Sequence, residues 1–445
     1  MAFMIYTLCG VLLLNVVFAF KLFRNILAPP VLLGAGMLGA AIVAALHYDA
    51  WRMDVMLYES VLLLGGSTLL FTLFCSIFRK TPEFVNGDSD RVMSMSMLRK
   101  RKLKKFYVVL IVLAVACFFL KMYCFMRFFG GFLNYSELIG AAKADTASGE
   151  LRFHFPVYVT ALAYIGRMSS FFTCWLLALS LLSKDSDKRL RLFLIVHIML
   201  VVADGVTGGT KDAIFDPLFR LGVVYVFVYF AKRKSLYLSF KIVLGIILGI
   251  YLCVSGLKGL SEVIGRSGVD NRESSDMFAE YMGAEIKNFD IYMHGYAFAP
   301  KSIYPGQATF QRFYTEIFPN FKITPGTFQD IGGYHLGNVY TQVYSFHKDF
   351  GVTGVIIMNF IIAFVAMLFY NRALLTLKSP QKLNLFLFIY SSASLCLFMA
   401  FFSSRFTENI FTLMFIRRII ALYIFILMFK HFFFVKPYKV TVNKR

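Results

Sequence analysis

The stretch GVTGVIIMNFIIAFVAMLFYN, residues 351–371, decides the fold class, because it contains no charged side chain over its whole length. About 20 consecutive apolar residues in an α-helix are enough to cross the hydrocarbon core of a membrane. Comparable stretches recur along the chain. We predict eleven membrane-spanning helices, at residues 3–20, 28–46, 55–78, 106–127, 156–182, 192–204, 213–230, 242–257, 351–371, 383–402 and 410–430.

The composition of the whole chain supports this prediction. Hydrophobic residues make up 58% of the 445 residues and charged residues only 16%, whereas a soluble domain is about one quarter charged. This composition excludes disordered, collagen-like, coiled-coil and disulfide-rich secreted proteins. The seven cysteines lie in apolar stretches, which indicates small apolar core residues rather than a disulfide framework or a metal site. We therefore expect an all-α polytopic membrane protein.

The net charge of +21 predicts which loops face the cytoplasm, because Lys and Arg concentrate in the cytoplasmic loops of membrane proteins. One alternating set of loops, which includes the C-terminal tail, carries 27 of the 46 Lys and Arg residues, and the other set carries 13. The N-terminus is then outside and the C-terminus inside. The basic run 99–105 abuts a predicted span, where topology signals and lipid contacts are expected, so we expect no nucleic-acid partner.

The predicted spans divide the chain into three segments. Residues 1–257 contain eight spans, residues 258–350 form a large outer loop, and residues 351–445 contain three spans and a basic cytoplasmic tail. Loops of this length are uncommon and usually functional. Aromatic and Met residues at helical spacing predict an amphipathic helix over 275–293, and a second amphipathic stretch, 338–346, leads into the next span.

Charged residues inside predicted spans are candidates for function, because each costs about 2.5–3.5 kcal/mol at the centre of a membrane helix. Arg220 follows Asp216 by one helical turn, so it forms either a structural pair or part of a polar site. Arg417 and Arg418 are adjacent and point about 100° apart, so at least one should face a polar interior. Lys211 ends a glycine-rich turn before a helix, which is either an anion site or a simple connection.

The richest chemistry in the outer loop lies in the glycine-rich stretch 332–341. His335 is set among glycines, close to the hydrogen-bonding side chain of Asn338. An imidazole with an ordinary pKa near 6.5 can act as a general base, although a solvated histidine is the simpler interpretation. His294 and His347 are competing candidates.

Several short motifs of the chain resemble those of the Wzy-type O-antigen polymerases, which link oligosaccharide repeat units in bacterial inner membranes. The long outer loop late in the chain is similar to the large periplasmic loop of that family. The motifs that resemble the family are the Gly208–Lys211 turn, Met282–Asp290, the Pro305–Phe310 turn, Gly337–Thr341, Asp349-Phe350-Gly351 with Gly354, and the spacing of Arg272 and Gly283.

The resemblance implies a reaction and a set of site residues. A polymer on undecaprenyl diphosphate would be transferred to a lipid-linked repeat unit at the periplasmic face, by a metal-independent, inverting glycosyltransferase without a cofactor. The fold would be like that of the O-antigen ligases. In those ligases a loop histidine activates the acceptor hydroxyl and arginines neutralise the diphosphate, so His335, with Asn338, is the nearest match. The candidate diphosphate ligands are Lys211, Arg220, Arg266, Arg312 and Arg405, with Arg272, Arg417 and Arg418 in reserve.

Other functions remain open at this stage. An O-antigen ligase, or another glycosyltransferase acting on lipid-linked sugars, is the nearest alternative enzyme. A lipid-linked oligosaccharide flippase is the alternative from a different class, against which stand the missing inverted repeat and the long outer loop. The expected partners are the undecaprenyl-diphosphate-linked donor and acceptor, membrane lipid, and a chain-length regulator whose need the sequence does not decide.

Overall fold

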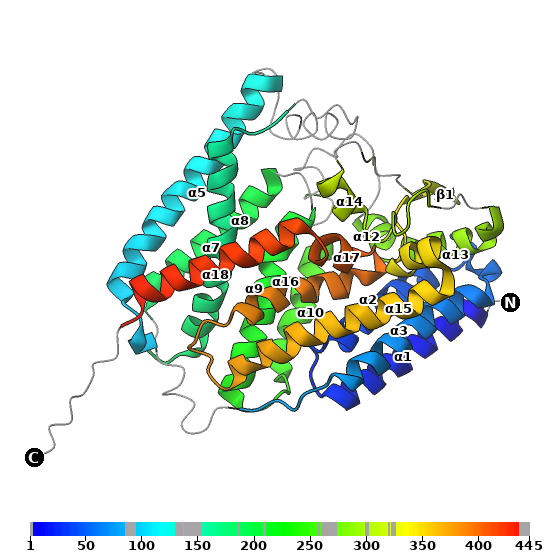
Figure 1. The fold of residues 1–445 in the computed structure, drawn as a ribbon, viewed down its shortest axis with the longest axis horizontal. Helices are drawn as coiled ribbons and strands as arrows, with labels where there is room; N and C mark the ends of the chain where they lie inside the picture. Colours follow the sequence, from blue (N-terminus) through cyan, green and yellow to red (C-terminus); the bar gives the residue numbers. More distant parts are fainter. Residues whose placement is uncertain are drawn as a thin grey trace, which may run out of the picture. The chain divides into compact units, whose positions relative to one another are not determined.

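The computed structural model describes residues 3–84, 95–129, 137, 153–185, 187–207, 211–255, 259, 274–298, 302–318, 321 and 326–435. Eight helices in these residues are long and apolar enough to cross a membrane (Figure 1). They confirm an all-α, multi-pass membrane protein. The eight are α1 (Phe3–Phe23), α2 (Pro29–Leu46), α3 (Tyr58–Ile77), α5 (Lys100–Phe129), α7 (Val157–Leu182), α8 (Lys188–Thr207), α9 (Lys211–Arg233) and α15 (Gln342–Ala373).

The other three predicted spans also lie on helices, but these helices differ in length or charge. The helices α10 (Phe240–Ser255) and α16 (Leu385–Phe398) are 16 and 14 residues long, and a 3-10 turn, Met399–Phe401, extends α16. The helix α18 (Leu413–Phe433) has the length of a span but carries Arg417, Arg418 and Lys430. Eleven crossings therefore remain a prediction.

The described part of the predicted outer loop contains short helices and a β-hairpin. The helices are α12 (Ser274–Met282), α13 (Ala284–His294) and α14 (Gln311–Ile317), and the antiparallel strands are β1 (Gln329–Ile331) and β2 (Tyr334–Gly337). The predicted helix 275–293 is broken at Gly283. A Cβ atom at this glycine would lie 2.8 Å from the Val43 side chain and 3.0 Å from the backbone nitrogen of Ala44, so close packing against α2 explains the break.

The chain folds into two compact units. The first comprises Met1–Glu83, Ser235–Leu375 and Phe386–Arg418, and the second comprises Phe84–Lys234, Thr376–Leu385 and Ile419–Arg445. In the first unit α1, α2 and α3 pack on one another, and α15 packs along α3 (Figure 1). In the second unit α5, α7, α8 and α9 pack together.

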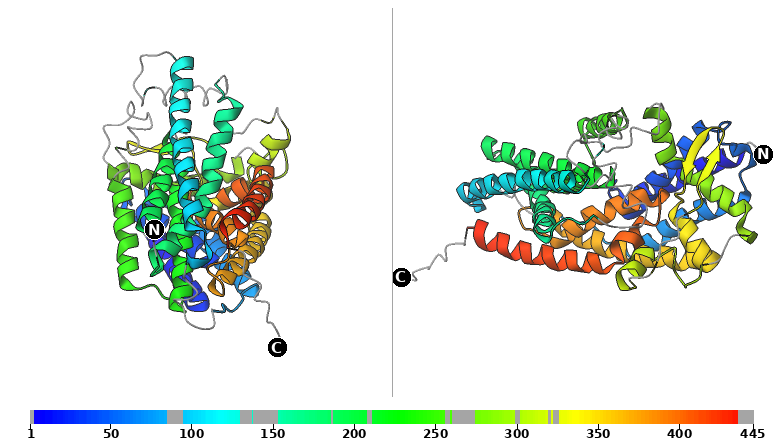
Figure 2. Two further views of the ribbon diagram at one scale, coloured as in Figure 1. Left: turned by 90° about the vertical axis from the view of Figure 1, so that its left-hand side faces the viewer. Right: turned by 90° about the horizontal axis from the view of Figure 1, so that it is seen from above.

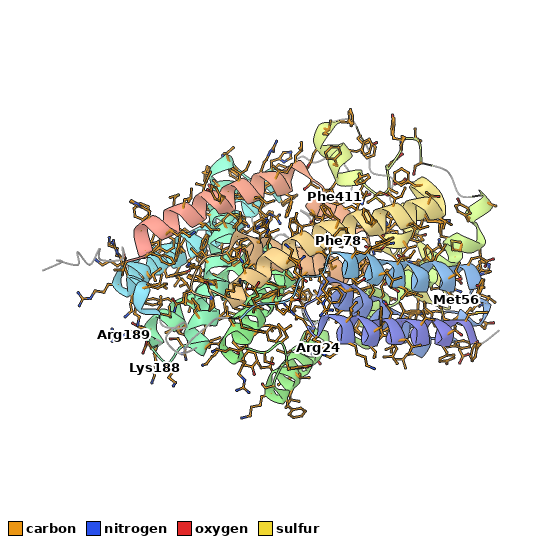
Figure 3. All side chains as sticks on the ribbon, turned by 60° about the horizontal axis from the view of Figure 1, so that its bottom comes forward. Arg24, Met56, Phe78, Lys188, Arg189 and Phe411 are labelled. Atoms are coloured by element: carbon orange, nitrogen blue, oxygen red, sulfur yellow. The ribbon has the colours of Figure 1, made fainter. Side chains whose placement is uncertain are left out.

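The first unit has two chemically different ends, and Arg24 and Met56 lie at opposite ones (Figure 3). At the Arg24 end, the guanidinium group of Arg79 lies 5.8 Å from the ring of Phe23. The C-terminal end of α15 is fixed there as well, because Asn371 Nδ2 donates to the carbonyl oxygen of Phe78 at 2.7 Å. This end therefore joins the C-terminal ends of α1, α3 and α15 beside basic residues.

At the Met56 end, α13 and the β-hairpin cover the helices. The carboxylate of Asp290 accepts hydrogen bonds from the backbone N–H of Leu57 at 2.9 Å and from the hydroxyl of Ser60 at 2.8 Å. The hairpin lies beside the N-terminal helices (Figure 2), where the ring of Tyr334 contacts Trp51 edge to face. The elements of the predicted loop thus form a folded cap on this end of the unit.

Candidate functional site

A cavity of about 400 Å³ lies within the first unit, between the cap and the beginning of α15. Its wall also includes residues of α17 (Arg405–Ile410) and the turn before it. The cavity residues Tyr344, Ser345 and Lys348 precede a kink in α15 at Gly351, and the helix from Gly354 to Asn371 beyond the kink rises about 26 Å. The cavity is therefore at the opposite end of the unit from Arg24 and Arg79. Its polar lining residues are Ser302, Gln307, Gln311, Asn338, Tyr344, Ser345, Lys348, Ser403, Arg405 and Glu408.

The carboxylate of Asp349 holds the segment 302–310 on α15. It accepts hydrogen bonds from the backbone N–H of Thr309 at 2.7 Å, from the N–H of Ala308 at 3.2 Å and from the hydroxyl of Ser302. The backbone of Gly306 has a φ of +76°, which favours glycine in this turn. The Pro305–Phe310 turn and the Asp349 motif, which were separate in the sequence, are thus one structural element.

The α17 helix brings a carboxylate and a guanidinium group to the cavity. Glu408 is 9% exposed, and its Oε1 atom accepts hydrogen bonds from Gln311 Nε2 at 3.3 Å and from the hydroxyl of Ser404 at 3.4 Å. Its Oε2 atom accepts from the hydroxyl of Ser403 at 3.3 Å and lies 3.9 Å from Nη1 of Arg405. The guanidinium group of Arg405 also lies 5.0 Å from the ring of Phe402.

Aromatic side chains form another wall of the cavity. The rings of Tyr340 and Tyr344 stack with centroids 4.3 Å apart, and Lys348 Nζ donates to the hydroxyl of Tyr344 at 3.0 Å. Burial raises the pKa of Tyr340, so this phenol is neutral and donates its proton to the carbonyl oxygen of Thr327 at 3.0 Å. This wall therefore has apolar ring faces, with hydroxyl groups at the ring edges.

Asn338 is a candidate site residue from the sequence, and it lines this cavity. Asn288 fixes the segment that contains Asn338. Asn288 is fully buried in α13, and its Nδ2 atom donates to the carbonyl oxygens of Leu336 and Val339 at 3.0 and 2.9 Å. On the other side, Gly326 lies close to the carbonyl oxygen of Asn338. Contacts with Asn288 and with Gly326 therefore hold the segment that contains Asn338.

The second sequence candidate in this stretch, His335, does not belong to the described lining of the cavity. It lies on β2, where Leu336 points inward and is 3% exposed, while the side chain of His335 points outward and is 66% exposed. Its Nδ1 atom pairs with the carboxylate of Asp330 on the neighbouring strand. The alternation of side chains along a strand thus separates His335 from the cavity.

The two competing histidines are also engaged elsewhere. His347 is 4% exposed, shares a hydrogen bond of 3.1 Å with the hydroxyl of Tyr292, and packs against the ring of Tyr296. His294 donates to the carbonyl oxygen of Val55 at 3.0 Å. Neither histidine is among the described residues that line the cavity.

The candidate cations are divided among several places. Arg405 lines the cavity, and Arg312 and Arg418 line a smaller cavity of about 150 Å³ on the same unit. Arg312 Nη1 donates to Oδ1 of Asn409, which is on α17 as well. Arg417 is exposed on α18. The structure therefore brings Arg312, Arg405 and Arg418 to the surroundings of α17.

Arg220 and Lys211 belong to the second unit. Arg220 is 4% exposed, pairs with Asp216 and donates to the hydroxyl of Ser170 at 2.7 Å. Its guanidinium group also lies 3.7 Å from the ring of Phe171. Lys211 begins α9, and the placement of its side chain lies outside the described part of the structure, as do Arg266 and Arg272.

Sequence reasoning missed several lining residues, among them Gln311, Tyr344, Lys348 and Glu408. Glu408 was visible as an acid at the end of a span, but nothing in the sequence pairs it with Gln311, 97 positions away. The described residues contain no cluster of three or more His, Cys, Asp or Glu side chains that could hold a metal ion.

Comparison of the chain with protein-family models, with curated proteins and with solved structures gives no match. The function is therefore inferred from the chemistry of the chain's own side chains. Among the described residues, the lining of the cavity combines aromatic side chains, neutral hydrogen-bonding groups, two cations and one carboxylate. Such a set can hold a polar, ring-containing ligand that carries negative charge.

Proposed function

We propose that the protein is a bacterial inner-membrane glycosyltransferase that polymerises lipid-linked oligosaccharide repeat units into an O-antigen-type polysaccharide. The donor and the acceptor would both be carried on undecaprenyl diphosphate. In this proposal the chain crosses the membrane eleven times, with the N-terminus in the periplasm and the C-terminus in the cytoplasm. The cavity of the first unit would be the active site and would face the periplasm.

The observation that carries the proposal is the composition and position of this cavity. It lies at the end of the first unit away from Arg24 and Arg79, as expected for a periplasmic site under the positive-inside rule. Tyr344, which is partly exposed and is backed by the buried ring of Tyr340, offers aromatic surface for a sugar ring, and Gln311 and Asn338 offer amides for sugar hydroxyls.

The two cations of the cavity suit the leaving group of the proposed reaction. Undecaprenyl diphosphate departs as an anion, so fixed positive charge near its oxygens stabilises the transition state. Arg405 can bind phosphate through two parallel N–H groups, and Lys348 adds a compact charge held by the Tyr344 hydroxyl. These side chains can supply the electrostatic stabilisation themselves, in keeping with a metal-independent reaction.

The banding pattern of surface polysaccharide in a deletion strain tests this proposal. Loss of a polymerase leaves lipid A-core that carries a single repeat unit. A normal ladder of long chains would reject the proposal. Loss of every repeat unit from the core, with accumulation of lipid-linked polymer, would instead identify a ligase. A strain that lacks only the chain-length regulator would show whether chain length depends on a partner.

A further inference from the structure

We infer that Glu408, and not His335, is the general base that activates the acceptor hydroxyl in the cavity of the first unit. This inference rests on the proposed glycosyl transfer, since it assigns a role within that reaction. A general base must lie within hydrogen-bond reach of the proton that it removes. Glu408 is the one carboxylate among the described residues that line the cavity.

The surroundings of Glu408 fix the orientation of its carboxylate at the cavity. The hydrogen bonds from Gln311, Ser403 and Ser404 come from neutral groups and are 3.3 to 3.4 Å long, and the Nη1 atom of Arg405 lies 3.9 Å from Oε2. An ionised carboxylate offers about four acceptor positions, so three such bonds do not exhaust them. The donors hold the carboxylate on α17, where Glu408 lines the cavity.

His335 fails the same requirement on geometry. Its side chain is 66% exposed on the outward face of β2 and pairs with Asp330, and it does not belong to the described lining. To reach a hydroxyl in the cavity, the strand would have to rotate and expose Leu336, which is 3% exposed. Burial of this leucine therefore opposes a catalytic position for His335.

The proposed reaction forms one bond and breaks one bond. The acceptor hydroxyl oxygen forms a bond to the anomeric carbon of the donor sugar, and the bond from that carbon to the diphosphate oxygen breaks. The electron pair of the broken bond leaves with undecaprenyl diphosphate, and the hydroxyl proton passes to Glu408 and then to water. Carboxylates perform the same task in inverting glycosidases, where they activate water on the face opposite the leaving group. Here a sugar hydroxyl replaces that water.

A carboxylate at this position has a second advantage. The sugar carbon develops positive charge in an oxocarbenium-like transition state. Negative charge on Glu408 stabilises that carbon, while Lys348 and Arg405, whose Nη1 atom lies 3.9 Å from Glu408, stabilise the departing diphosphate. The described lining thus holds one acid and two cations, which leaves a net positive charge for the diphosphate.

The test uses the purified full-length protein in lipid nanodiscs with an undecaprenyl-diphosphate-linked repeat unit as substrate. We compare the wild type with Glu408→Gln, Glu408→Asp and His335→Ala, and measure kcat, KM and the thermal midpoint of each. We expect Glu408→Gln to lower kcat by about 10²- to 10⁴-fold with little change in KM, because glutamine keeps the shape and one acceptor oxygen but not the basicity. Glu408→Asp should retain more activity than Glu408→Gln, and His335→Ala should stay within about threefold of the wild type.

A chemical-rescue measurement separates a base from a structural residue. In Glu408→Ala, added formate can occupy the vacated volume and accept the proton, so polymer formation should rise with formate concentration, whereas His335→Ala should not respond. The inference is overturned if Glu408→Gln keeps more than about a tenth of the wild-type kcat, or if His335→Ala loses as much as Glu408→Gln. Absence of polymer formation by the folded wild type would instead reject the proposed function.

Discussion

Asp349, near the beginning of α15, accepts a hydrogen bond from the backbone N–H of Thr309 at 2.7 Å, although the two residues lie 40 positions apart. The same carboxylate accepts the N–H of Ala308 and the hydroxyl of Ser302. One charged group at the mouth of a membrane helix therefore holds the segment that supplies Gln307 and Gln311 to the cavity. The shape of the cavity depends on this carboxylate.

Replacement of Asp349 by alanine should loosen this segment. Hydrogen bonds to a charged group contribute about 1.5–3 kcal/mol each, and losses at one site are not additive, so we expect Asp349→Ala to lower the free energy of unfolding by about 2–4 kcal/mol. Thermal unfolding in detergent measures this loss. Asp330→Ala is the control, because the Asp330 side chain is 65% exposed and its removal should cost less than about 0.5 kcal/mol. Equal stability of the two variants would contradict the role of Asp349.

Gly326 should not tolerate a side chain. A Cβ atom there would lie 2.5 Å from the carbonyl oxygen of Asn338 and 2.6 Å from the ring of Tyr340. Because overpacking costs about 1–3 kcal/mol, Gly326→Ala should lower the thermal midpoint and displace the Tyr340 wall. Gly222→Ala is the matched control, since no heavy atom lies within 4 Å of its added Cβ, and alanine should be neutral or stabilising within a helix. An unchanged midpoint in Gly326→Ala would disprove this packing.

The positions of the helices were largely predictable from the sequence, because a span is a local property. All eleven apolar stretches lie on helices, and the stretch 351–371 falls within α15. The break at Gly283 was not predictable, because it arises from contact with Val43 on α2, more than 200 positions away. The hairpin was missed because its strands are only three and four residues long.

The candidate site was predictable only in part, because its residues come from segments that are distant in the sequence. Asn338 and Arg405 were named from motif and charge, and both line the cavity. His335 was named with Asn338 from the resemblance and their closeness in the chain, but the side chain of His335 points outward on β2, whereas Asn338 follows the strand and lines the cavity. Glu408 was not among the candidate site residues, because its place in the cavity depends on segments that meet only after folding.

Arg220 should be a structural residue of the second unit. It pairs with Asp216, donates to Ser170 and contacts the ring of Phe171. Loss of one partner from a buried pair costs about 3–5 kcal/mol, and since the Asp216 side chain is 37% exposed, we expect about 2–3 kcal/mol for Arg220→Ala. The amount of folded protein in membranes should fall accordingly. Arg312→Ala, at an exposed position, is the control. A normal amount of Arg220→Ala protein without activity would show instead that Arg220 binds substrate.

Glu285 should make the protein less stable as the pH rises. This residue is 2% exposed in α13, and its Oε2 atom accepts no hydrogen bond from the described residues. Burial raises the pKa of Glu285 well above its ordinary value, so the folded protein keeps the proton while the unfolded chain releases it above about pH 4.3. The unfolded state then binds fewer protons than the folded state, and the free energy of unfolding decreases with pH across this window.

Glu285→Gln removes this dependence, because glutamine does not ionise in either state. The variant should match the wild type near pH 4 and become more stable relative to it by up to about 1.36 kcal/mol per pH unit, until the pKa of the folded state is reached. Thermal unfolding between pH 4 and pH 8 measures the difference. Glu316→Gln is the control for loss of a carboxylate that makes hydrogen bonds, because the Glu316 carboxylate accepts the N–H groups of Leu413 at 2.6 Å and of Met414 at 3.3 Å, so the variant should be less stable than the wild type. Parallel curves for Glu285→Gln and the wild type would show that Glu285 is ionised in the folded protein.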